Sequence, residues 1–103
     1  MISLAFMLSA AVVNATPSMS TMEPEQRDSQ CLVALRAENG LGSLHEAAKA
    51  YFEQRVGKIS DPELRELLVL SAEEAILPNT NRREIASTCL LLYQVLLLQE
   101  KRR

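Results

Sequence analysis

Signals that start and stop helices recur along residues 23–103, and they constrain the fold more than any other feature of this chain. Three residue pairs have the spacing of a capping box, in which a polar residue precedes a helix and a glutamate follows three positions later: Ser43 with Glu46, Ser60 with Glu63, and Asn81 with Glu84. Prolines that suit a first helical turn and residues that end helices supply the remaining signals: Pro24, Pro62, Asn39, Gly40, Gly42, Gly57 and Pro78. The sequence therefore predicts four helices, at about residues 24–39, 44–56, 61–77 and 82–101.

Apolar residues recur at helical spacing within these segments. The second and third helices each carry one apolar face, formed by Leu44, Ala47, Ala48, Tyr51, Phe52 and Val56 and by Leu64, Leu67, Leu68, Ala72, Ala75 and Ile76. The last helix is apolar nearly all round at its centre, so we expect it to be the most buried. Its apolar run is rich in Leu rather than in β-branched residues, which argues against a strand. Short connections predict an all-α fold, a small antiparallel bundle in which the last helix packs against the other three.

Two cysteines, Cys31 and Cys89, fall on the first and last predicted helices. Cys31 is in phase with Leu35, and Cys89 shares a face with Ile85 and Leu92, so both side chains are expected to point inward. If the two ends of the bundle are neighbours, the sulfur atoms can form a disulfide that joins them. A redox-active pair is disfavoured because the C-x-x-C arrangement is missing, and a zinc site because two thiols and one histidine do not supply four ligands.

The N-terminus predicts export. Residues 2–13 are uncharged and apolar over about the length of a secretory signal core, and they are too short to span a membrane. Small residues at Val13 and Ala15 suit a signal peptidase, so we expect a signal peptide at residues 1–15, a flexible leader at 16–22, a single helical domain at 23–103, and a periplasmic or secreted location. The alternatives are an uncleaved tether and a start at Met19 or Met22, which would leave both cysteines reduced in the cytosol.

Composition argues against two classes of partner. The chain has 11 basic and 13 acidic residues, a formal net charge of -2 at pH 7, and no tryptophan. A dedicated nucleic-acid binder would carry a basic excess and aromatic stacking platforms, so we expect no nucleic-acid partner. The terminal cluster Lys101-Arg102-Arg103 lies where a helix dipole favours cations, and it is too small for a stable membrane anchor after cleavage.

No set of residues has the spacing of a catalytic site. His45 is expected to be a partly exposed polar residue, because no serine or cysteine nucleophile is placed to partner it. Glu73 and Glu74 are adjacent, so on a helix they diverge by about 100° and cannot cooperate as a glycosidase pair. We therefore expect neither an enzyme nor a cofactor.

Arg82 and Arg83 break a local rule, because cations in the first turn of a helix oppose its dipole. One interpretation is that Glu73, Glu74 or Glu84 neutralises them. The other is that Asn81, Arg82 and Arg83 form an anion site together with the free N–H groups of the helix.

Three stretches resemble small exported helical proteins of sphingomonad-type alphaproteobacteria: residues 1–11, residues 24–28 leading to Cys31, and Tyr51-Phe52 with Arg55. The resemblance implies a Gram-negative periplasm and an all-helical fold, and it carries over no activity or site residue. In size, export and a single long-range disulfide, the chain also resembles small periplasmic acid-stress chaperones.

Two functional hypotheses follow. The first is a non-enzymatic periplasmic interaction protein that binds a protein partner, or a second copy of itself, through the Leu-rich last helix. The second is a holdase that binds clients when acid or another stress loosens the bundle and exposes that same helix.

Overall fold

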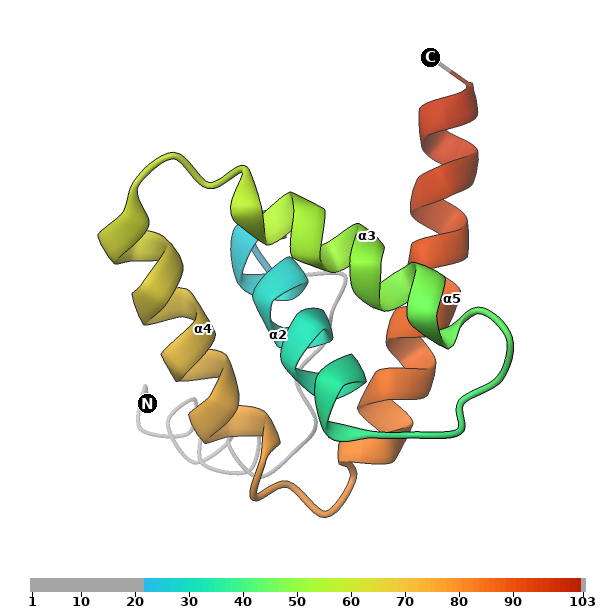
Figure 1. The fold of residues 1–103 in the computed structure, drawn as a ribbon, viewed down its shortest axis with the longest axis horizontal. Helices are drawn as coiled ribbons and strands as arrows, with labels where there is room; N and C mark the ends of the chain where they lie inside the picture. Colours follow the sequence, from blue (N-terminus) through green and yellow to red (C-terminus); the bar gives the residue numbers. More distant parts are fainter. Residues whose placement is uncertain (1–21, 103) are drawn as a thin grey trace, which may run out of the picture.

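The computed structural model describes residues 22–102, which form four helices and no strand: α2 (Pro24–Ala37), α3 (His45–Gly57), α4 (Pro62–Ile76) and α5 (Arg82–Lys101) (Figure 1). The predicted all-α helical bundle is confirmed. Each helix begins and ends within two residues of its predicted range. The predicted signal peptide at 1–15 and the leader up to residue 21 lie outside the described residues.

Helix α2 occupies the centre of the fold and packs against α3, α4 and α5 (Figure 1). All its residues from Asp28 to Leu35 are buried, whereas α5 buries only Ile85, Ala86 and Cys89. The prediction that the last helix is the most buried and packs against the other three is therefore wrong, because α5 packs mainly against α2 and α3. A helix surrounded by others is buried whatever its polar content, so leucine content does not reveal which helix the topology places in the middle.

The helix starts differ from the predicted capping boxes. Asp61, rather than Ser60, caps α4, and its carboxylate accepts hydrogen bonds from the N–H groups of Glu63 and Leu64. No side chain caps α3 or α5. At α3 the chain makes a tight turn instead, in which the His45 N–H donates to the Gly42 carbonyl at 3.2 Å. The three pairs thus located the helices correctly but identified none of the capping side chains.

The connection from α2 to α3 contains two glycines that need their conformational freedom. Gly40 and Gly42 have φ angles of 69° and 105°, in the left-handed region that side chains with a Cβ rarely adopt. Helix α2 ends at Ala37, with Glu38 already extended, so these glycines lie after its end and the prediction that they end it is wrong. The connection that contains them turns the chain back so that α3 packs on α2.

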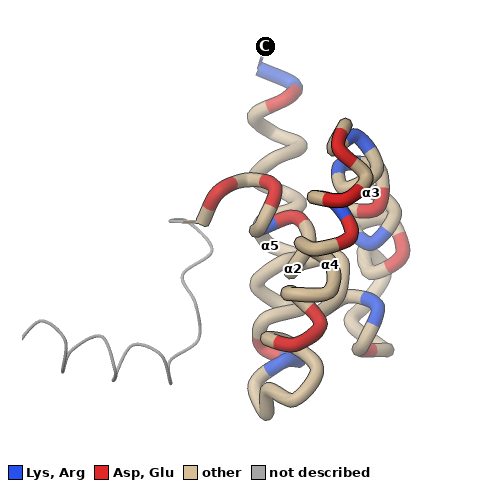
Figure 2. The backbone as a smooth tube through the Cα atoms, turned by 90° about the vertical axis from the view of Figure 1, so that its left-hand side faces the viewer, with Lys and Arg blue, Asp and Glu red and all other residues tan. Residues whose placement is uncertain are grey.

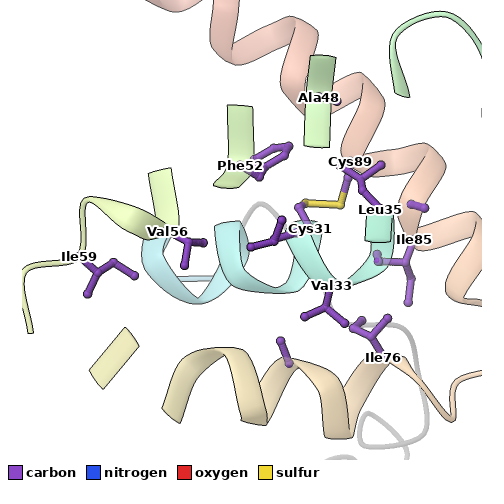
Figure 3. Close-up of a cluster of buried hydrophobic side chains, with 14 residues drawn as sticks. Cys31, Val33, Leu35, Ala48, Phe52, Val56, Ile59, Ile76, Ile85 and Cys89 are labelled. Carbon is purple, nitrogen blue, oxygen red and sulfur yellow. A yellow bond between two sulfur atoms is a disulfide. The ribbon is translucent and has the colours of Figure 1, made fainter. Parts of the chain in front are cut away.

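The core forms around α2 with side chains from all four helices (Figure 3). The largest fully buried apolar side chains include Leu35 of α2, Phe52 of α3, Ile76 of α4 and Ile85 of α5. Burial of one such side chain is worth about 1.5–3 kcal/mol. The core therefore fixes the positions of α3, α4 and α5 relative to the central helix.

The predicted disulfide joins Cys31 of α2 to Cys89 of α5, with Cα atoms 5.5 Å apart (Figure 3). Both cysteines are fully buried, and Leu92 and Leu96 pack against the same core. Because one face of α5 is held inward in this way, the rotation of the helix about its axis is fixed. The opposite face of α5 must then point to solvent.

Candidate interaction surface

The solvent-facing side of α5 carries a stripe of apolar side chains at its centre. Leu91, Val95 and Leu98 follow one another at spacings of four and three residues, which places them along one stripe of the helix. Their exposed fractions are 64%, 49% and 56%. No charged side chain occurs from residue 85 to residue 99, and this uncharged stretch lies below the charged C-terminal end of α5 in Figure 2. We call Leu91, Val95 and Leu98 the α5 stripe.

A shallow groove widens this apolar surface. It lies between the α2–α3 connection and α5, and its apolar lining comes from Leu41, Leu44, Leu90 and Leu91. Leu44 is itself 40% exposed. The groove shares Leu91 with the α5 stripe, so the two form one continuous patch of the kind that marks interaction sites.

The C-terminal turns of α5 extend beyond the other helices in both views (Figures 1 and 2). One side of this projection is held by α3. The Tyr51 hydroxyl donates a hydrogen bond of 2.6 Å to the Glu100 carboxylate, and the rings of Tyr51 and Tyr93 meet edge to face at 5.2 Å between centroids. Helix α3 therefore supports the side of α5 that does not carry the stripe.

A buried carboxylate links α2 to α3. Asp28 is only 4% exposed and accepts hydrogen bonds from Arg27 at 3.0 Å and from Arg55 Nε at 2.8 Å. Arg55 also donates to the Tyr51 hydroxyl at 3.2 Å and lies 3.6 Å from Glu100. Both Asp28 carboxylate oxygens are thus bound by guanidinium groups. This arrangement neutralises the buried charge and leaves neither oxygen free to accept a proton from a substrate.

The pKa values of this cluster follow from the same contacts. Desolvation by burial, followed by the hydrogen bond to Glu100, raises the pKa of Tyr51 above its usual value. Desolvation alone would lower the pKa of Arg55, but the hydrogen bond and negative charge of Asp28 outweigh it and raise the pKa. Tyr51 stays a neutral donor and Arg55 a cation, which suits a structural link between α3 and its neighbours.

Sequence reasoning assigned no role to this cluster of Asp28, Tyr51 and Arg55. One signal was present. Asp28 lies three residues before Cys31, so a helix places an acidic side chain near the buried cysteine face. An acid so placed requires a cationic partner, and Arg55 supplies it from α3.

His45 is buried, with 6% of its surface exposed, so the prediction of a partly exposed polar residue is wrong. Its Nε2 lies 2.7 Å from the Leu35 carbonyl oxygen, which can only accept, so the ring donates this hydrogen bond. Leu35 lies in the last turn of α2, where carbonyl groups lack partners within the helix. The imidazole therefore ties the start of α3 to the end of α2.

Arg82 and Arg83 are neutralised by Glu38, not by Glu73, Glu74 or Glu84. The Glu38 carboxylate lies 2.9 Å from Arg82 Nε and 3.4 Å from Arg83 Nη1. The two guanidinium groups also donate to the backbone carbonyls of Leu77, Asn39 and Gly40. These contacts join the end of α2 to the start of α5. An anion site at Asn81, Arg82 and Arg83 remains a prediction, and its arginine donors already have protein acceptors.

Residues 22–102 contain neither a metal-binding cluster nor a membrane-spanning helix. No group of three or more histidine, cysteine, aspartate or glutamate side chains is arranged to hold a metal ion, and no helix in this range is long and apolar enough to cross a membrane. Comparison with family models, curated proteins and solved structures gave no match. Among the described residues, the apolar surface around α5 is therefore the candidate functional site.

Proposed function

We propose that this protein is a non-enzymatic interaction module that binds a protein partner through the α5 stripe. The observation that carries the proposal is the exposure of Leu91, Val95 and Leu98 on a helix whose opposite face is held by the disulfide. Exposed leucine and valine side chains aligned on one helix form a natural seat for an apolar partner surface. The stripe is exposed in the folded protein, which favours constitutive binding over an acid-activated holdase that must loosen the bundle first.

We further propose that the protein acts in the periplasm or outside the cell. The disulfide supports this location, because such bonds persist in oxidising compartments and are rare in the cytosol. Intact-mass spectrometry of the protein recovered from its cell tests the idea. The expected mass begins at Thr16 and is two hydrogens lighter than that of the reduced chain. Residues 1–15 retained together with free thiols would contradict the proposal.

Site-specific photo-cross-linking in the producing cells tests the interaction. A photoreactive phenylalanine derivative replaces Val95 in the stripe, and the matched control carries it at Leu70 on α4, where the native side chain is similarly exposed at 50%. We expect covalent protein adducts from position 95 and few from position 70. An absence of adducts at position 95, or equal yields at both positions, would contradict the proposal.

A further inference from the structure

The α5 stripe is the centre of a longer seam. Counting outward from Leu91, Val95 and Leu98 by alternating steps of three and four residues reaches Thr88 and Glu84 on one side and Arg102 on the other. All six residues are exposed: Glu84, Thr88, Leu91, Val95, Leu98 and Arg102. Alternating steps of three and four are the spacing of the contact positions in a coiled coil. At 1.5 Å per residue the seam is about 27 Å long.

The ends of the seam carry opposite charges. Glu84 is negative, Arg102 is positive, and among residues 22–102 neither side chain has an ion-pair partner. Every other charged residue near the start of α5 differs in this respect, since Arg82 and Arg83 are paired with Glu38. The seam thus ends in two unmatched charges of opposite sign.

These features suit a second copy of the same helix in the antiparallel direction. A two-fold axis near residue 93 would place Glu84 opposite Arg102 of the partner, Leu91 opposite Val95, and Leu98 opposite Thr88. Each pairing then occurs twice, as a symmetric interface requires. A parallel pairing would instead place Glu84 against Glu84 and Arg102 against Arg102, and like charges at such positions repel.

We propose that the chain forms an antiparallel homodimer through this seam. This proposal rests on the proposed role of α5 as an interaction surface. The apolar pairs exclude water at the centre, and the two Glu84–Arg102 pairs set direction and register. Positions 87, 94 and 101 flank the seam on one side, and positions 85, 92 and 99 flank it on the other. Lys101 is the only charged residue among them, so little charge repulsion opposes the approach of a second copy.

Charge reversal tests the direction of pairing by sedimentation equilibrium at high micromolar concentration. In the antiparallel dimer, Glu84→Arg creates two Arg–Arg contacts and Arg102→Glu creates two Glu–Glu contacts. Each variant should raise the dimer dissociation constant roughly tenfold, since exposed ion pairs are individually weak. The double variant restores opposite charges and should return to the wild-type value. An equimolar mixture of the two single variants should form heterodimers of wild-type affinity.

Other outcomes overturn the proposal. A wild-type protein that stays monomeric would overturn it. Single variants that dimerise as tightly as wild type would also overturn it, because that result is expected for a parallel pairing. Far-UV circular dichroism confirms that each variant is folded, and the double variant controls for altered helix-dipole interactions. A monomer that still forms position-95 adducts with another protein would leave the proposed function standing and remove only the homodimer.

Discussion

Removal of the Cys31–Cys89 disulfide should destabilise this domain severely. The bond joins residues 58 apart in the sequence, so it restricts a large part of the unfolded chain. The chain-entropy relation for a loop of this length gives about 4 kcal/mol at 25 °C. A domain of this size has a total unfolding free energy of about 5–10 kcal/mol. The double variant Cys31→Ala/Cys89→Ala should therefore retain only a few kcal/mol.

Urea unfolding followed by circular dichroism measures this loss. We expect the midpoint of the double variant to fall by about 2–4 M relative to the oxidised wild type. Wild-type protein reduced with dithiothreitol is the matched control, because it keeps both sulfur atoms in the buried site and removes only the covalent bond. If the unfolding free energies of oxidised and reduced protein differed by less than about 1 kcal/mol, the claim that the disulfide stabilises the fold by restricting the unfolded chain would be refuted.

Three further outcomes are expected. At low micromolar concentration, where the monomer is titrated, Leu91→Ser should change the unfolding free energy in urea by less than about 0.5 kcal/mol, as should Leu67→Ser on α4, because both side chains are more than 60% exposed; a larger loss for Leu91→Ser under these conditions would mean that it supports the core. His45→Ala should cost about 1–3 kcal/mol because the Leu35 carbonyl loses its donor, and a stability equal to wild type would contradict the assigned hydrogen bond. Because the pKa of Tyr51 is raised in the folded state, its contribution to stability is complete below pH 10 and is lost as pH rises through the folded-state value. Tyr51→Phe should make unfolding less sensitive to alkaline pH, and an unchanged pH profile would refute that assignment.

Local rules predicted the elements of this fold well. Glycine and proline positions, together with the three capping-box pairs, located all four helices, because these residues limit backbone geometry or favour helix starts wherever they occur. The phase of Cys31 and Cys89 also predicted the disulfide, since inward-facing cysteines on neighbouring helices can meet. Capping side chains were not predicted, because Ser60 and Asp61 both have suitable oxygens and only the backbone geometry decides between them.

Long-range arrangement was the part that the sequence could not supply. Helix α2 is central although it contains Asp28, Ser29 and Gln30, and the Leu-rich α5 lies at the side. The partners of His45 and Asp28 depend on which helices meet, which no single-helix pattern contains. The excess of leucine on α5 did indicate more apolar surface than one buried face needs, and the exposed stripe accounts for part of it.

The central claim is that the protein associates through the α5 stripe. The association state of two matched leucine variants tests this claim most directly. Leu91→Ser/Leu98→Ser alters the α5 stripe, and Leu67→Ser/Leu70→Ser alters leucines of similar exposure on α4. Molar mass by light scattering at high micromolar concentration should give a dimer for wild type and for the α4 variant, and a monomer for the α5 variant. A dimer that survives the α5 changes, or that the α4 changes abolish, would contradict the account.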